Sequence, residues 1–180
     1  MTVNFNPFPE LKTARLTLRQ LSHNDDAQMF VLRGDPQIMK YIHRPIAKTI
    51  ADAAAVIDMI NEKVNSNESI NWAITLTGSD RLIGFIGYVR MAKENYRAEI
   101  GYLLHADFQG TGVMQEAVEC IIAYGFKTLG LHSIEAVVSP ENIASVKLLE
   151  RNKFVREAYF KENEFYNGTF NDTAIYSLLA

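Results

Sequence analysis

The segment Gln109-Gly110-Thr111-Gly112-Val113-Met114 is the most informative part of the chain, because it sets two glycines directly before a long apolar stretch. Glycine lets the backbone turn sharply and approach a ligand closely. The first N–H groups of a helix have no acceptor within the helix, and the helix dipole favours an anion beside them. The segment therefore predicts a phosphate-binding loop at the start of a helix.

Other interpretations of this loop can be compared with its residues. A P-loop needs a lysine after the last glycine, and a dinucleotide-binding fingerprint needs a third glycine where Gln115 stands. A tight turn without a ligand remains an alternative if the segment is considered alone. The surrounding sequence must decide between the phosphate loop and the plain turn.

The residues on both sides of the loop predict one strand–helix–strand unit. A nearly all-apolar helix is expected over 112–129, with Gly130 as its stop. Before it, the patterns predict three antiparallel strands, at 70–77, 81–91 and 97–105. After it, an apolar strand at 132–139 is expected to lie parallel to the third of these strands.

The remaining segments complete a single domain over residues 1–180. A strand is expected at 15–19, and two strands at 154–164 and 169–178 are joined by an Asn167-Gly168 turn. Helices are expected at 24–33, 47–65 and 139–153, the last capped by Ser139 with Pro140 in its first position. The predicted fold class is α+β, a mixed and mostly antiparallel sheet of about seven strands flanked by about four helices.

Composition excludes several classes of function. The formal net charge of -3 and the pI near 5.8 argue against a nucleic-acid binder. The single cysteine, Cys120, cannot form a disulfide within the chain, so a reducing compartment is expected. The first ten residues lack the features of a signal peptide, and no apolar run reaches the roughly 18 residues of a membrane span. We expect a cytoplasmic protein that binds neither membranes nor nucleic acid.

The order of short motifs resembles the GNAT acetyltransferases, whose loop reads Gln/Arg-x-x-Gly-x-Gly/Ala. Residues 109–114 match it except that Met114 replaces a small residue. Further similarity covers nearly the whole chain and is closest to the ribosomal-protein N-terminal acetyltransferase branch. It is carried by Leu11-x-Thr13-x-Arg15-Leu16-x-Leu18-Arg19, Glu99-Ile100-Gly101-Tyr102, Glu116-Ala117, His132-Ser133-Ile134-Glu135-Ala136 and Pro140-Glu141-Asn142-x-x-Ser145.

The resemblance implies a site for acetyl-CoA, the acetyl donor, in a V-shaped gap between two parallel strands. The pyrophosphate would bind Gln109, Gly110, Thr111, Gly112, Val113 and Met114. The pantetheine arm would pair with Tyr102, Leu103 and Leu104 and contact Asn142 and Ser145. A backbone N–H near Leu104 would polarise the thioester carbonyl.

The resemblance also implies direct attack of an amine on the thioester, without an acyl-enzyme. Glu99 and Glu164 are candidate general bases, and Ser145 is a candidate to protonate or hold the departing thiolate. Each has a plain structural alternative: a solvated strand residue, a surface charge, and a serine bonded to its own helix. Leu149 stands where many members carry a tyrosine acid, so that role does not transfer.

The expected function is acetyl transfer to a primary amine, with a protein or peptide N-terminus as the favoured acceptor. Tyr41, His43 and Arg44 are expected to line the acceptor pocket. A small-molecule amine such as a polyamine, an amino acid or an aminoglycoside is the alternative acceptor, and a non-catalytic acyl-CoA-binding module is an alternative function. The histidines show no metal-ligand spacing, so no metal site is expected. The chain is expected to be a monomer or a homodimer.

Overall fold

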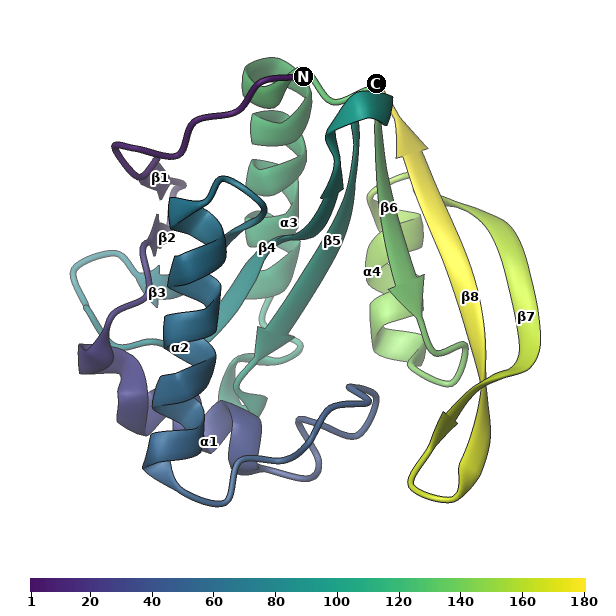
Figure 1. Cartoon of the computed structure of the whole chain (residues 1–180), viewed down its shortest axis with the longest axis horizontal. Helices are drawn as coiled ribbons and strands as arrows, with labels where there is room; N and C mark the ends of the chain where they lie inside the picture. The colour runs from purple at the N-terminus through teal and green to yellow at the C-terminus, as the bar shows by residue number, and fades with distance from the viewer.

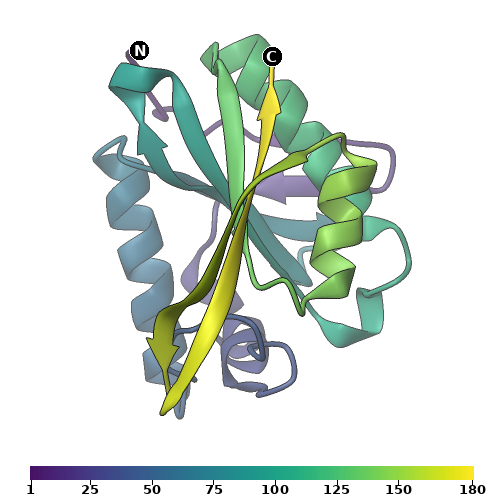
Figure 2. The same ribbon diagram turned by 90° about the vertical axis from the view of Figure 1, so that its right-hand side faces the viewer.

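The computed structural model describes residues 1–180, which form one sheet covered by helices on both faces (Figures 1 and 2). The sheet has eight strands in the order β1-β2-β3-β4-β5-β6-β8-β7. The strands are β1 (Leu11–Lys12), β2 (Leu16–Arg19), β3 (Ile70–Leu76), β4 (Gly84–Ala92), β5 (Arg97–Leu104), β6 (Ser133–Val138), β7 (Val155–Tyr166) and β8 (Thr169–Leu179). The helices are α1 (Asp26–Gly34), α2 (Ile50–Asn65), α3 (Val113–Tyr124) and α4 (Ile143–Arg151).

The predicted α+β class, the four helices and the mixed sheet are confirmed. Every neighbouring pair of strands is antiparallel except β5 and β6, which are parallel as the strand–helix–strand pattern predicts. The expected count of about seven strands is one too low, because β1 spans only Leu11–Lys12. Two residues are too few to show the period-2 alternation by which a strand is read from sequence.

The parallel strands β5 and β6 diverge after three residue pairs. Their register pairs Arg97 with Ser133, Ala98 with Ile134 and Glu99 with Glu135, and no pairing follows. On its other side β5 remains paired with β4 as far as Leu104. A β-bulge interrupts β4 between Tyr88 and Arg90, opposite the point of divergence, and bulges bend and twist a strand locally. The gap between β5 and β6 widens downward in Figure 1.

The helices divide between the two faces of the sheet. In Figure 2, α1 and α2 lie on the left of the sheet, whereas α3 and α4 lie on the right. Side chains of a strand alternate between faces, so Glu99 and Tyr102 of β5 point to opposite faces. Tyr102 contacts α4 through Ser145, which places Glu99 on the face of α1 and α2.

A single core of 35 buried residues joins the sheet to these helices. Trp72 is fully buried, and its indole N–H donates to the carbonyl of Pro9 at 2.7 Å, so it is a packing residue of the core. Tyr88 is also fully buried and donates to the carbonyl of Ile121 in α3 at 2.7 Å. A Cβ on Gly125 would lie 2.0 Å from the Tyr88 hydroxyl, so this close approach requires glycine.

Four element boundaries differ from expectation by three residues or more. α2 begins at Ile50 rather than at residue 47. α3 ends at Tyr124, and a wider π-helical turn, Gly125–Leu129, completes the stretch predicted as one helix. α4 begins at Ile143 rather than after Ser139, because the Asn142 side chain caps it by accepting from the Ser145 N–H at 3.2 Å. β4 begins at Gly84 rather than at residue 81.

Candidate functional site

The loop Gln109–Met114 presents a run of free backbone amides. Gly110 and Gly112 have φ of 73° and 82°, a left-handed conformation that favours glycine. No hydrogen bond is donated by the N–H groups of residues 110–115, and the first bonded amide of α3 is that of Glu116, 3.1 Å from the Gly112 carbonyl. Free amides at the positive end of a helix dipole suit a pyrophosphate.

Side chains of the loop hold its shape. Gln109 donates from Nε2 to the Leu104 carbonyl at 3.1 Å, and the Thr111 hydroxyl donates to the Phe108 carbonyl at 2.6 Å. Met114, the departure from the family pattern, packs its side chain partly against the core, and its N–H stays free. The loop therefore offers its backbone, rather than these side chains, to an anion.

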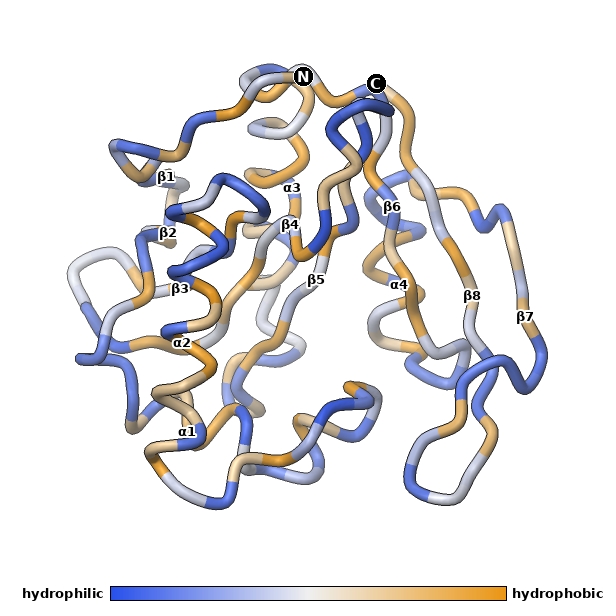
Figure 3. Tube along the Cα trace, in the orientation of Figure 1, coloured by the Kyte–Doolittle hydropathy of each residue, from blue (hydrophilic) through white to orange (hydrophobic).

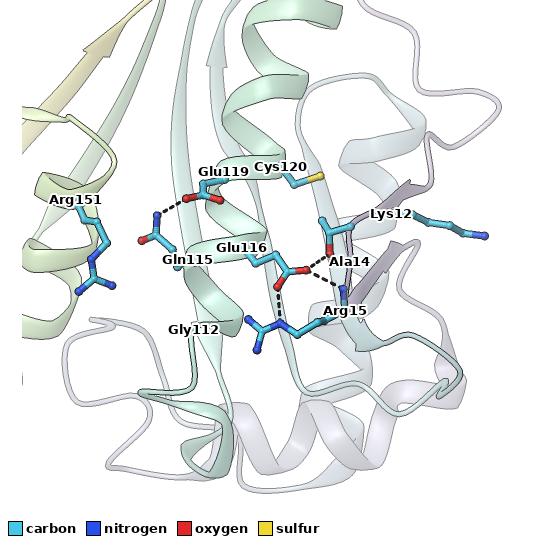
Figure 4. Close-up of a pocket in the computed structure, with 10 residues that line it drawn as sticks. Lys12, Ala14, Arg15, Gly112, Gln115, Glu116, Glu119, Cys120 and Arg151 are labelled. Atoms are coloured by element: carbon cyan, nitrogen blue, oxygen red, sulfur yellow. Dashed lines mark hydrogen bonds and ion pairs between the residues drawn. The ribbon is translucent and has the colours of Figure 1, made fainter.

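A charged cluster fixes the loop from the N-terminal segment (Figure 4). Arg15 donates from Nε to Glu116 at 2.6 Å and from Nη1 to the Thr111 carbonyl at 3.2 Å. Glu116 also accepts from the Thr13 hydroxyl at 2.5 Å and the Arg15 N–H at 2.8 Å. These bonds lower the pKa of Glu116 against the opposing effect of desolvation, so it remains an anion paired with Arg15.

A groove of about 660 Å³ adjoins this cluster, beside the first turns of α3. Arg15 and Arg151 reach it from opposite sides in Figure 4. Cys120 also lines the groove, half-buried, and burial raises the pKa of its thiol. A raised pKa disfavours the reactive thiolate, in agreement with a structural role for Cys120.

The diverging half of β5 carries the residues expected to meet the pantetheine arm. Tyr102, Leu103 and Leu104 lie beyond the last β5–β6 pair, so their backbone faces no strand on the side of β6. The Tyr102 hydroxyl lies 2.7 Å from the Ser145 Oγ on α4. Asn142 uses Oδ1 to cap α4, which leaves its side-chain N–H groups unbonded.

The bond between Tyr102 and Ser145 is a contact that the sequence did not reveal. Ser145 was expected either to act on the thiolate or to bond its own helix, and its hydroxyl instead meets a tyrosine on β5. Burial raises the pKa of Tyr102 to about 12. The pair is therefore a protonated hydroxyl couple beside the gap.

Glu99 lies at the point where β5 and β6 separate. Its side chain is only 15% exposed, and its Oε2 has no hydrogen-bond donor. Arg90 approaches that oxygen to 3.3 Å without hydrogen-bonding geometry. Desolvation raises the pKa of Glu99, Arg90 and Arg44 lower it, and Glu135 raises it. The net effect is a carboxylate with increased proton affinity.

The predicted acceptor residues lie on the loop after α1, which reaches toward the β7–β8 hairpin (Figure 1). His43 Nδ1 lies 2.8 Å from Glu164 Oε2, and its ring stacks on Tyr166 with centroids 5.0 Å apart. The Tyr166 hydroxyl donates to the Arg44 carbonyl at 2.8 Å. The structure thus brings together His43, Arg44 and Glu164. Tyr41 is half-buried beneath the Lys40 ammonium and shows no bond to the other three.

The loop after α1 alternates hydrophilic and hydrophobic stretches in Figure 3. Arg33, which precedes this loop in α1, was missed from the sequence. Its Nε is buried without a hydrogen-bond partner. An arginine in a helix gives no sequence signal for this state, which depends on how the loop folds back.

Other polar groups do not form a further centre. No cluster of three or more His, Cys, Asp or Glu side chains is arranged to hold a metal ion. His105 accepts from the Asp107 N–H at 3.2 Å and caps a short turn before the phosphate loop. None of the helices combines the length and the apolar composition that crossing a membrane would require.

Comparisons with known proteins agree with this geometry. Residues 15–155 match the model of the acetyltransferase (GNAT) domain. The chain is 36% identical over 169 residues to the N-acetyltransferase p20 of Bacillus licheniformis, covering 94% of this chain and 95% of that protein. It also superposes on the crystal structure of a GNAT-family acetyltransferase from Bacillus anthracis with a TM-score of 0.84 and 27% identity, covering 95% and 98% of the two chains.

Two other relatives differ in the acceptors that their names state. The spermidine N(1)-acetyltransferase of Vibrio cholerae is 26% identical over 162 residues, covering 88% of this chain and 90% of that protein. The ribosomal-protein-serine acetyltransferase of Escherichia coli is 32% identical over 98 residues, covering 54% and 55%. Since the family model covers most of the chain and the fold agrees, the chain belongs to the GNAT family of acetyl-CoA-dependent N-acetyltransferases.

Proposed function

We propose that the chain acetylates the α-amino group of a protein or peptide N-terminus, with Glu99 as the general base. The observation that carries this proposal is the desolvated Glu99 carboxylate, whose unbonded oxygen lies where β5 and β6 separate. A general base works best when its pKa approaches the operating pH. Burial moves Glu99 in that direction.

An α-amino acceptor matches the strength of such a base. The attacking amine must be neutral, and an α-amino group has a pKa near 7.7–8.0, whereas a lysine side chain has one near 10.4. A fraction of about 10–15% of α-amino groups is therefore neutral at pH 7 without assistance. A carboxylate of modestly raised pKa is then sufficient to receive the proton, either directly or through a water molecule.

Acetyl-CoA supplies the acetyl group, and the loop amides of residues 110–115 would hold its pyrophosphate. The unpaired backbone of Tyr102, Leu103 and Leu104 would pair with the pantetheine arm. In the reaction the amine nitrogen bonds to the thioester carbonyl carbon, and the proton that it loses goes to Glu99. The carbon–sulfur bond breaks, and the leaving CoA thiolate receives a proton.

The proton for the thiolate would come from the Tyr102–Ser145 couple. Either hydroxyl can donate across their 2.7 Å contact, so the one nearer to sulfur can be reprotonated by the other. With a pKa of about 12, Tyr102 keeps its proton at neutral pH. This couple fills the role that a tyrosine has in other members at the position of Leu149.

Glu164 has a different part in this scheme. Its carboxylate already bonds His43, which is 14% exposed, while Glu164 itself is 42% exposed. We assign Glu164 the positioning of His43 and of the hairpin tip around the acceptor. It is the second candidate for the base if Glu99 proves dispensable.

A small-molecule amine is the second candidate acceptor, because the spermidine acetyltransferase is a relative over nearly the full length. Release of the CoA thiol from acetyl-CoA separates the possibilities across Ser-, Ala- and Met-starting peptides, spermidine, free amino acids and an aminoglycoside. Turnover confined to peptides supports the proposal, and turnover confined to spermidine refutes it. Binding of acetyl-CoA without any turnover would favour a non-catalytic module.

A further inference from the structure

Two arginines beside the acceptor face lack any counter-ion. No carboxylate lies within 4.0 Å of the guanidinium of Arg33 or Arg44, and neither guanidinium forms a hydrogen bond. The Arg33 Nε is also sealed from solvent. Arg15, Arg19, Arg90 and Arg97 are each paired with a carboxylate, whereas Arg81, Arg151 and Arg156 also have no such partner. What distinguishes Arg33 among the unpaired arginines is that its unbonded Nε is buried.

The fold brings the two cations toward one another. The Ala47 N–H donates to the Arg33 carbonyl at 3.0 Å, which folds the loop after α1 back on the end of that helix. Tyr166 holds the same loop through the Arg44 carbonyl. Burial lowers the pKa of Arg33, and the like charge of Arg44 lowers it further. Arg44 in turn lowers the pKa of Glu99, so Arg44 lies close enough to the proposed base to interact with it.

Such an arrangement is unfavourable without a ligand. A half-buried guanidinium loses hydration, and an unbonded buried donor adds to that loss. Arg33 lies in the last turn of α1, where the helix dipole favours a cation. The dipole supplies no acceptor for Nε, however. A carboxylate bound at the exposed Arg44 would offset the mutual repulsion of the two cations, and a guanidinium can bind it through parallel hydrogen bonds.

We propose that Arg33 and Arg44 form a carboxylate-binding subsite that selects acceptors with a negative charge close to the reacting amine. The inference rests on the proposed function and specifies its substrate class. The carboxylate can belong to an acidic side chain near a peptide N-terminus or be the α-carboxylate of a free amino acid. The same two charges repel a polyamine.

The test compares matched acceptors by kcat/KM at constant acetyl-CoA and low salt. One pair is the amidated peptides Ser-Asp-Ala-Ala and Ser-Asn-Ala-Ala, and the other is serine and serinamide. Wild type is compared with Arg44→Gln, Arg33→Gln and the control Arg81→Gln, an exposed arginine at the β3–β4 turn. Each preference is compared between wild type and variant, so differences in amine basicity cancel.

We expect Arg44→Gln to lower the preference for one carboxylate-bearing acceptor about tenfold relative to wild type and Arg81→Gln, while retaining turnover of the neutral acceptor. If the peptide pair shows the change, the carboxylate belongs to an acidic side chain; if the serine pair shows it, the carboxylate is the α-carboxylate of a free amino acid. If Arg33→Gln fails to fold, the exposed Arg44 still decides the outcome. If the preference within both acceptor pairs is the same in an active wild type and in Arg44→Gln, the subsite alone is overturned. Turnover of serine but of no peptide would support the subsite and overturn the peptide acceptor of the proposed function. Turnover of spermidine but of neither a peptide nor an amino acid overturns both proposals, and so does silence with every amine.

Discussion

Replacing Glu99 with glutamine tests the proposed chemistry and the electrostatics together. The substitution keeps the shape of the side chain and removes its charge. In wild type that charge lies on a side chain only 15% exposed, with one oxygen unbonded. The variant should therefore be more stable and less active than wild type at neutral pH.

The stability gain follows from linkage between folding and proton binding. Desolvation raises the pKa of Glu99 in the folded protein, so the folded state binds this proton more tightly than the unfolded chain does. The ionised Glu99 destabilises the fold. This destabilisation is absent below the ordinary carboxyl pKa and develops as the pH rises through the raised pKa of the folded state. Each tenfold change in proton affinity corresponds to about 1.4 kcal/mol. A gain of about 1 kcal/mol raises the Tm of a chain this long by about 2–4 °C.

Glu99→Gln also removes the ion pair with Arg90, and the exposure of Arg90 limits how much stability is lost with that pair. Its side chain is 75% exposed, and its ion pair with Glu99 has a separation of 3.3 Å. Exposed ion pairs contribute less than about 1 kcal/mol. The desolvation effect should therefore dominate, and Glu99→Gln should melt higher than wild type at pH 7.5 but equally near pH 4.

The activity should change in the opposite direction. General-base catalysis contributes about 10²–10⁴-fold, and a fall of about 10²-fold in kcat/KM is expected for an amine that is partly neutral by itself. The wild-type profile should rise with pH as Glu99 loses its proton, and the variant should lack that limb. Affinity for acetyl-CoA should not change, because Glu99 lies on the face opposite to Tyr102 and α4.

Differential scanning fluorimetry at pH 4 and 7.5 and steady-state kinetics from pH 5 to 9 provide the measurements. Glu68→Gln is the matched control, since Glu68 is exposed and forms no ion pair. A variant that melts lower than wild type at pH 7.5 would refute the electrostatic reasoning. Unchanged kcat/KM with the acidic limb intact would exclude Glu99 as the base and direct attention to Glu164.

Three further predictions concern the donor side and the core. Tyr102→Phe and Ser145→Ala should each lower kcat about tenfold. The double variant should lose no more activity than either single variant, because both hydroxyls belong to one proton path. Additive losses in steady-state kinetics would show that the two residues act separately. Gly112→Ala should weaken acetyl-CoA binding about tenfold by calorimetry, since its φ of 82° disfavours a Cβ beside the loop amides; equal affinity would contradict the loop assignment. Gly125→Ala should cost about 2–3 kcal/mol in urea unfolding, because its Cβ would overlap the Tyr88 hydroxyl, and a smaller loss would mean that Tyr88 can move.

Local signals in the sequence were sufficient for the elements around the donor site. Gly110 and Gly112 indicated the loop because glycine permits a sharp turn and a close approach to a ligand, and the apolar stretch after them indicated α3. The strand–helix–strand order was sufficient for the parallel pair β5–β6. Ser139 was predicted to cap α4, and the folded loop instead lets Asn142 cap it by accepting from the Ser145 N–H.

The acceptor side depends on contacts between distant segments. His43 and Glu164 are 121 residues apart in sequence, and both were candidates without any sign that they would meet. The Tyr102–Ser145 contact joins β5 to α4 across 43 residues. Arg33 could not be selected at all, because the burial of its unbonded Nε is a property of the folded chain and not of the local sequence. Hydrophobic periodicity predicts single helices and strands, and it does not predict which side chains of different elements will be in contact.

The divergence of β5 from β6 has a consequence for the stability and solubility of the protein in a cell. Beyond Glu99, β5 is a strand edge inside the sheet that no other strand covers, and uncovered edges promote intermolecular pairing. A donor that pairs with this edge would act as a missing strand. At a free concentration of 100 times its Kd, the donor would add about 2.7 kcal/mol to the free energy of unfolding by mass action. The abundance and solubility of the enzyme would then follow the supply of acetyl-CoA, and a cell short of acetyl-CoA would lose the catalyst along with its substrate.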